Sequence, residues 1–173
     1  ALVVALQMNA FIRHADMVKM ANIAQIVNVI APLVTRPDGL LRQSIYYPFA
    51  AISQAAGDTA LDLYWEGDTF EGGGHSGLRV LDVAGTLANG REVALFVVNR
   101  SQAPAEAEIV LQEGAFAGQG SATIINGPDV KATNSFDDPE QVTAREAPLS
   151  PQGVSLVQVF EPHSLTVLRL PIC

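Results

Sequence analysis

Cysteine is almost absent from this sequence: the only one, Cys173, is the last of the 173 residues. A single cysteine cannot form a disulfide within the chain or supply a cysteine-based zinc site. The three histidines, His14, His75 and His163, lie far apart in sequence and have dissimilar neighbours. We therefore expect no metal and no other cofactor. The lone cysteine is compatible with a reducing compartment, which favours a cytoplasmic location.

Basic residues and long apolar runs are also scarce. The chain has 10 Lys and Arg against 18 Asp and Glu, a formal net charge of -8. Binding to nucleic acid requires clustered basic side chains, so we expect no nucleic-acid partner. The apolar residues 1–6 are followed by the polar Gln7 and Asn9, well short of the ~20 apolar residues that cross a membrane. No membrane partner is expected, and this beginning resembles the middle of a helix, which suggests a fragment.

Residues 1–57 have the pattern of a helix, a strand and a second helix. Residues 2–18 are apolar around most of a helical circumference. Residues 20–34 form a nearly continuous apolar run, typical of a strand buried on both faces, although a partly helical structure remains open. After a loop at 35–39, Ser44 can cap a helix over 45–56, with Pro48 in its first turn and Gly57 at its end. These elements cannot bury their own apolar faces.

From about residue 58 the pattern changes to short strands separated by turn residues. The Asn89-Gly90 pair between two apolar runs predicts a hairpin. Seven or eight short strands at this spacing indicate an antiparallel β-sandwich or jelly roll over 58–173, with a boundary near 57–60. The strand-like runs are 60–66, 78–87, 91–101, 105–113, 121–126, 154–161 and 163–170.

The acidic clusters do not look catalytic. Glu66, Asp68 and Glu71 lie in a polar, glycine-rich stretch that predicts a solvated connection. Asp137 and Asp138 precede Pro139, which favours a turn. A glycosylation sequon at 99–101 matters only in a secretory pathway, and such tripeptides often arise by chance.

Four stretches resemble one enzyme family. They are HADMVKMANIAQIVNVIAPLVTRPDGLLRQSIYYPF (14–49), VALFVVNRS (93–101), ATNSFDDPEQV (132–142) and PHSLTVLRL (162–170). The first resembles the end of the catalytic barrel in family 51 of the glycoside hydrolases, the α-L-arabinofuranosidases, and the others resemble the β-sandwich that follows it. The resemblance implies a mostly β chain: residues 1–57 would be the last helix–strand–helix of a (β/α)8 TIM barrel, and 58–173 a C-terminal jelly roll.

The resemblance also implies an activity. The family comprises retaining, exo-acting enzymes that hydrolyse terminal arabinofuranosyl residues of arabinan- or arabinoxylan-type glycans with two glutamates. Both glutamates are expected upstream of Ala1, so this chain would hold no catalytic residue and would be inactive alone. Its implied partners are an arabinofuranosyl-containing oligosaccharide or polysaccharide, the rest of the catalytic barrel, and copies of itself in a homo-oligomer, commonly a hexamer in the family.

One substrate-binding residue is implied by the same resemblance. The glutamine of the family's RQ(T/S)IYYPF motif hydrogen-bonds the arabinofuranosyl unit, and Gln43 occupies that position, with Ser44 where the family usually has Thr. An amide can donate to and accept from sugar hydroxyls without adding charge. The alternative is a glutamine that bonds backbone groups at a helix start. Arg42, Tyr46 and Tyr47 are interpreted as supports that pack this loop.

A second function remains open from the sequence: a stand-alone, non-catalytic β-sandwich that binds carbohydrate or serves assembly. Such a module needs exposed aromatic side chains on one face. Tyr64 and Trp65 are neighbours on one predicted strand and point to opposite faces, and aromatic residues make up only 6% of the chain. The sequence therefore favours the enzymatic parentage.

Overall fold

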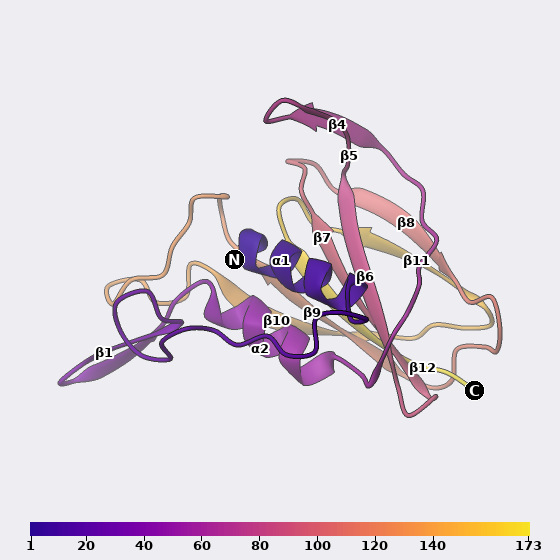
Figure 1. The fold of residues 1–173 in the computed structure, drawn as a ribbon, viewed down its shortest axis with the longest axis horizontal. Helices are drawn as coiled ribbons and strands as arrows, with labels where there is room; N and C mark the ends of the chain where they lie inside the picture. Colours follow the sequence, from indigo (N-terminus) through magenta and orange to yellow (C-terminus); the bar gives the residue numbers. More distant parts are fainter.

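The computed structural model describes all 173 residues, and its main element is an antiparallel six-stranded sheet (Figure 1). The expectation of a mostly β chain is confirmed. In spatial order the strands are β10 (Thr143–Leu149), β9 (Gly120–Asn126), β12 (Leu165–Pro171), β7 (Glu92–Asn99), β6 (Leu81–Ala88) and β3 (Thr59–Ala60).

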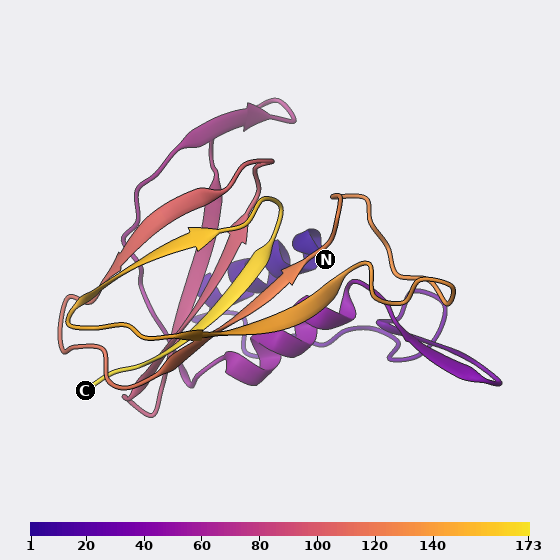
Figure 2. The same cartoon turned by 180° about the vertical axis from the view of Figure 1, so that it is seen from behind.

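Both faces of this sheet are covered. A two-stranded ribbon of β8 (Ala105–Val110) and β11 (Ser155–Phe160) packs on one face and completes the predicted sandwich. The helices α1 (Leu2–Arg13) and α2 (Tyr46–Ala55) pack on the other face, as Figures 1 and 2 show from opposite sides. Neither helix has the length and apolar character needed to span a membrane.

Strand β7 is buried along nearly its whole length because its neighbours cover both of its faces. Val93, Leu95 and Val97 belong to the core under the ribbon. Phe96 and Val98 belong to the core under the helices. Alternate residues of a strand point to opposite faces, so a strand covered on both sides reads as a continuous apolar run. This accounts for the run at 93–98.

The predicted hairpin at Asn89-Gly90 is confirmed. It joins β6 to β7, with Ala88 opposite Glu92 and the Arg91 amide donating to the Ala88 carbonyl at 2.9 Å. Asn89 and Gly90 both have positive φ, 51° and 65°, the conformation that this pair adopts most readily.

The buried strand expected over residues 20–34 is wrong, and so is its helical alternative. Residues 18–32 are irregular apart from an isolated bridge at Val27, and most of their side chains are exposed. Only the end of the run is in a strand, β1 (Leu33–Arg36), which pairs with β2 (Gly39–Arg42) in a hairpin around Pro37 and Asp38. A strand needs neighbouring strands to satisfy its backbone and bury its faces, and the only such contact of residues 20–30 is the isolated bridge between Val27 and Leu33 of β1.

The helix ends differ in detail from the sequence predictions. The first helix ends at Arg13 instead of residue 18. Helix α2 has Pro48 in its first turn, as predicted, but its N-cap is Ile45 and no side chain caps it. The predicted Ser44 cap is therefore wrong. Ser44 lies one residue before the N-cap.

Four strands differ from the sequence prediction: β3, β4, β5 and β10. The run 60–66 keeps the predicted alternation of burial, but it pairs with β6 only at its start, at Thr59–Ala60. Strand β10 lacks an apolar pattern and contains Pro148, which is tolerated because β10 lies at the sheet edge. The glycine-rich stretch forms a projecting hairpin of β4 (Thr69–Gly72) and β5 (His75–Arg79) (Figure 1).

Helix α1 is fixed to the sheet by a polar cluster around Asp82 of β6. The fully buried Asn9 donates from Nδ2 to Asp82 Oδ1 at 2.8 Å and to the Phe96 carbonyl at 3.1 Å. Arg13 donates to both carboxylate oxygens of Asp82, at 3.0 and 3.2 Å. The Asp82 side chain is 13% exposed, so it satisfies two residues of α1 at a largely dry contact.

The substitution Asp82→Ala should loosen α1 from the sheet. It leaves the buried Asn9 amide and the Arg13 guanidinium with fewer partners, which should cost about 1–3 kcal/mol of unfolding free energy. Urea unfolding followed by circular dichroism measures the loss. The matched control is Asp62→Ala, an exposed aspartate for which no hydrogen bond is found. Equal urea midpoints for the two variants would contradict the assignment.

Candidate functional site

Gln43 immediately follows β2 and is held at the junction between the β1–β2 hairpin and α2. Its backbone amide donates to the Pro32 carbonyl at 2.8 Å, and its carbonyl accepts the Tyr46 amide at 2.9 Å. These bonds fix the backbone on both sides of the side chain. Gln43 is half-buried, while Ala31 and Pro32 beside it are buried.

The Gln43 side chain uses its donor but not its acceptor within the chain. Nε2 donates to the Ala31 carbonyl at 2.8 Å, which is the backbone role considered as the alternative for this residue. No hydrogen bond is found for Oε1, so this atom can accept from a ligand hydroxyl. The bond from Nε2 orients the Gln43 amide, and Oε1 keeps its capacity to accept a hydrogen bond.

The three residues interpreted as supports lie around the start of α2. The rings of Tyr46 and Tyr47 meet edge to face, with centroids 5.5 Å apart, and the Arg42 guanidinium lies 5.4 Å from the Tyr46 centroid. Both tyrosines are half-buried. The same side chains border a polar pocket of about 380 Å³, which is also lined by the sheet residues Ser121, Thr123, Glu146 and Arg169.

A loop from the sandwich, residues 127–142 between β9 and β10, reaches this region. Asn134 donates from Nδ2 to the Arg42 carbonyl at 3.0 Å, across 92 residues of sequence. The Arg36 guanidinium lies 4.3 Å from the centroid of the Phe136 ring. No pattern in the sequence predicts either contact. The only signal was the motif at 132–142, which carried the family resemblance but no role.

The base of this loop is tied to the sheet by Glu161. Asn126 donates from Nδ2 to Glu161 Oε2 at 3.0 Å, and Arg145 of β10 forms an ion pair with the other carboxylate oxygen. The hydrogen bond from Asn126 has the largest effect and lowers the pKa of Glu161 below its ordinary value of 4.5. Burial opposes this effect, and the hydrogen bond and charge of Arg145 lower the pKa further. The ionised carboxylate of Glu161 therefore stabilises the base of the loop, where β9 ends and β10 begins.

The two acidic clusters are exposed. Tyr64 donates its hydroxyl to Glu66, and this bond, with the charge of Glu66, raises the pKa of Tyr64 above its ordinary value. Residues 135–138 form a turn in which the Ser135 amide bonds the Asp138 carbonyl and the Asp138 amide bonds Ser135 Oγ, both at 3.0 Å. The turn at 135–138 is as expected from the sequence. Glu66 and Asp68 lie in an exposed connection, as expected, whereas Glu71 lies in strand β4 of the projecting hairpin.

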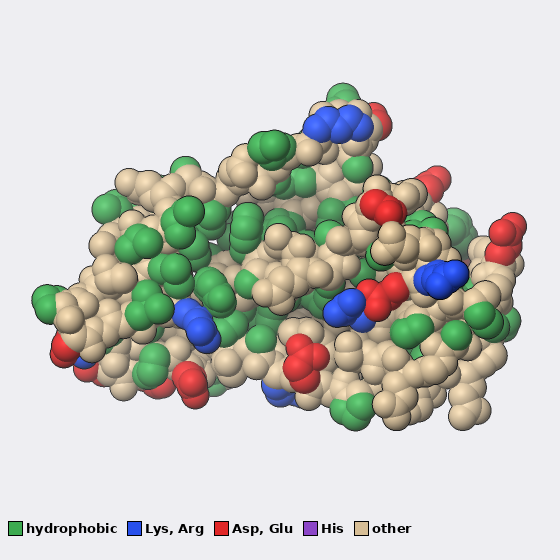
Figure 3. Space-filling view, turned by 90° about the horizontal axis from the view of Figure 1, so that it is seen from below, with side chains coloured by type: hydrophobic (Ala, Val, Ile, Leu, Met, Phe, Trp, Pro, Cys, Tyr) green, Lys and Arg blue, Asp and Glu red, His purple; other side chains and the backbone are tan.

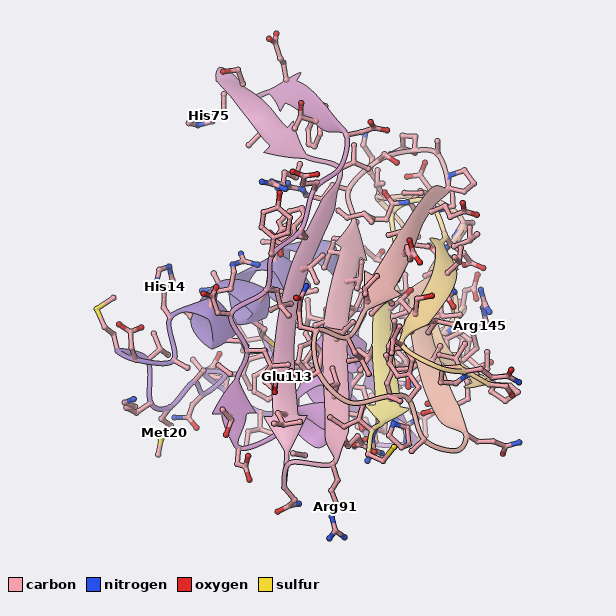
Figure 4. The ribbon with its side chains drawn as sticks, turned by 90° about the vertical axis from the view of Figure 1, so that its right-hand side faces the viewer. His14, Met20, His75, Arg91, Glu113 and Arg145 are labelled. Carbon is pink, nitrogen blue, oxygen red and sulfur yellow. The ribbon has the colours of Figure 1, made fainter.

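The histidines do not form a metal site, and the asparagine of the sequon is used inside the fold. His14 follows α1, whereas His75 lies on the projecting β4–β5 hairpin, well away from it (Figure 4). No cluster of three or more His, Cys, Asp or Glu with metal-binding geometry occurs. Asn99 of the sequon is fully buried, and its Nδ2 donates to the carbonyls of Ala103, Phe160 and Glu161. An amide in this position is inaccessible for glycan attachment in the folded chain.

The sequence and fold match one family of carbohydrate-active proteins. The family model described as the α-L-arabinofuranosidase C-terminal domain matches residues 1–164. The chain belongs to this family. The resemblance to the C-terminal portion of family 51 α-L-arabinofuranosidases is thereby confirmed.

Individual members of the arabinofuranosidase family match nearly the whole chain but only part of their own length. A probable α-L-arabinofuranosidase C from Aspergillus clavatus is 33% identical, over 98% of this chain and 34% of its own. An intracellular exo-α-(1→5)-L-arabinofuranosidase from Streptomyces lividans is also 33% identical, over 92% of this chain and 25% of its own. The solved structure of a family 51 α-L-arabinofuranosidase from Bifidobacterium longum superposes with a TM-score of 0.87 at 26% identity, over 98% of this chain and 34% of that one. The chain thus spans about a third or less of these relatives.

The arabinofuranosidase domain should lose stability in acid partly through Glu161. Because its pKa is lowered in the folded state, Glu161 stabilises the fold above about pH 4.5, and this contribution disappears as the pH falls through the folded-state pKa. The side chain is 40% exposed, so solvent screening limits the effect to no more than about 1 kcal/mol. Glu161→Gln should lower the melting temperature at pH 7 and reduce its difference from wild type near pH 3. Glu140→Gln, an exposed control, should do neither; an unchanged difference at the two pH values would refute the role.

Proposed function

We propose that this chain forms the C-terminal part of a retaining, exo-acting α-L-arabinofuranosidase that hydrolyses terminal arabinofuranosyl residues of arabinan- or arabinoxylan-type glycans. The observation that carries the proposal is the family match over residues 1–164, together with relatives of which this chain spans about a third or less. The two catalytic glutamates would belong to the remainder of the longer protein, so residues 1–173 would not be active alone.

In this proposal the chain contributes to two domains. Residues 1–57 close the catalytic barrel, and residues 58–173 form the sandwich that braces it. Gln43 contacts the arabinofuranosyl unit through Oε1 while the Ala31 carbonyl holds its Nε2. We further propose a cytoplasmic location, supported by the intracellular relative from Streptomyces lividans, and a homo-oligomer such as a hexamer as the assembled form.

Residues 17–40 expose an apolar surface, and this supports the proposal that other parts of a barrel pack against them. Its members include Met20, 79% exposed, and Val29, 81% exposed. Hydrophobic side chains gather over the left half of the view in Figure 3, where the β1–β2 hairpin lies, and Met20 points away from the body of the molecule in Figure 4. A contiguous apolar patch of this kind marks an interaction surface. The remaining barrel strands and helices would cover it.

A stand-alone carbohydrate-binding module has less support. Tyr64 is 85% exposed, but Trp65 turns inward and is half-buried, with the Arg79 guanidinium 4.2 Å from its ring centroid. The two rings do not form a flat platform on which a sugar could stack. The placement of these side chains therefore favours the enzymatic parentage.

Replacing Gln43 tests the substrate contact in the full-length protein. Gln43→Ala should lower kcat/KM for an aryl α-L-arabinofuranoside by about 5- to 150-fold, the effect of about 1–3 kcal/mol for a lost hydrogen bond at a buried site. Gln54→Ala on the exposed face of α2 serves as the matched control and should leave the kinetics unchanged. Identical kinetics for the two variants would remove Gln43 from the site, and a wild-type protein without arabinofuranosidase activity would remove the proposed function.

The 173-residue chain by itself should associate or be cleaved by protease within residues 14–40. The irregular segment 18–32 has few buried contacts, and its apolar side chains face solvent. Light scattering after gel filtration and limited proteolysis with mass spectrometry measure both properties. The double change Val29→Asp and Ile30→Asp should reduce association, whereas Val3→Asp on α1 should not. A sharply monomeric, protease-resistant wild-type chain would contradict the idea.

A further inference from the structure

The peptide group between Arg42 and Gln43 is held from both sides. Its N–H, which belongs to Gln43, donates to the Pro32 carbonyl at 2.8 Å. Its C=O, which belongs to Arg42, accepts from Asn134 Nδ2 at 3.0 Å. Because a peptide group is planar, bonds at its two ends fix the plane from which the Gln43 side chain departs. One of these bonds is local to the hairpin, and the other comes from the sandwich.

Asn134 is well placed to set this geometry. It is only 9% exposed, and its side chain bonds both backbone groups of Val142: Oδ1 accepts the Val142 amide at 2.7 Å, and Nδ2 donates to the Val142 carbonyl at 2.8 Å. Val142 is itself 5% exposed and belongs to the core under the helices. The amide of Asn134 is thus fixed to the sheet, and its second N–H is directed at Arg42.

The rest of the loop supports the same contact. The Phe136 ring lies 4.3 Å from the Arg36 guanidinium, and the position of a Cβ on Gly39 would be 3.5 Å from the ring. At the loop base, a Cβ on Gly127 would lie 2.9 Å from Val142 Cγ2, so the neck is tightly packed. The loop therefore contacts both strands of the hairpin from an anchored base.

We propose that Asn134 is a positioning residue for Gln43: by holding the Arg42 carbonyl, it sets the orientation in which the Gln43 amide meets an arabinofuranosyl unit. The proposal rests on the proposed function of Gln43. It assigns the sandwich a direct structural part in the substrate site, although Asn134 itself does not touch substrate. A purely structural alternative is that Asn134 serves only to close its own loop through Val142.

Asn134→Asp removes the contact with the hairpin and keeps part of the loop closure. The substituted side chain keeps an oxygen that can accept the Val142 amide, but it has no N–H for the Arg42 carbonyl or the Val142 carbonyl, so the comparison with Gln43→Ala described below is needed to separate the two roles. In the full-length protein this change should lower kcat/KM for an aryl α-L-arabinofuranoside by about tenfold, the size expected for one buried hydrogen bond. Ser135→Ala is the matched control, because Ser135 bonds Asp138 within the same loop and does not reach the hairpin.

A double-mutant cycle with Gln43→Ala decides whether Asn134 acts through Gln43. In the Gln43→Ala background, Asn134→Asp should change kcat/KM by less than about twofold, because the group that it positions is already gone. An equal tenfold loss in both backgrounds would show that Asn134 acts on general stability, and no loss in either would show that it does not act on the site. Either result would overturn the proposal.

Hydrogen exchange on the 173-residue chain tests the link without any activity. Loss of the Asn134 bond should speed exchange of the Gln43 amide by about tenfold relative to wild type, while amides of β7 remain unchanged. Unchanged Gln43 exchange in both Asn134→Asp and Asn134→Ala would overturn the positioning role. If the full-length protein lacked arabinofuranosidase activity, the proposed function would fail, and the exchange rates would still decide whether Asn134 holds the hairpin.

Discussion

The structure depends on a sheet that is apolar on both faces. Strands β7 and β12 supply side chains to two separate cores, one under the β8–β11 ribbon and one under the helices. A sheet with a single apolar face could leave its other face in water, but this one must cover both. The helices are therefore needed to cover one apolar face of the sheet. Phe96, which is fully buried, lies in the core that they complete.

This constraint also determines where the β1–β2 hairpin and the following Gln43 lie. Because α2 must lie on the sheet, the segment that precedes it is brought to the sheet's edge, beside the loop that connects β9 and β10. Asn9 and Arg13 fix α1 on the same face through Asp82, so the two helices share one platform. The Gln43 amide, which we propose contacts substrate, is consequently positioned by the sandwich as well as by the hairpin before it.

Local sequence signals predicted those parts whose partners are also local. The pair Asn89-Gly90 predicts its hairpin because the turn conformation is a property of those two residues. The run 20–34 misled because an apolar stretch becomes a buried strand only if other strands flank it. Strand β10 escaped prediction because its edge position, which the sequence does not reveal, permits Pro148. The Ser44 cap failed by one residue, which is within the ordinary uncertainty of helix starts.

The candidate site likewise has one part with local partners and one part with partners distant in sequence. Gln43 is a candidate site residue because it lies inside a recognisable motif, but the two hydrogen bonds that restrain its peptide group differ in origin. The bond to Pro32 forms within the hairpin, whereas the bond from Asn134 spans 92 residues and exists only after β9 and β10 have paired. No periodicity or turn rule connects positions so distant in sequence. The folded sandwich can therefore determine how the Gln43 side chain is presented, since the peptide that orients this side chain is fixed by a contact that only the sandwich supplies.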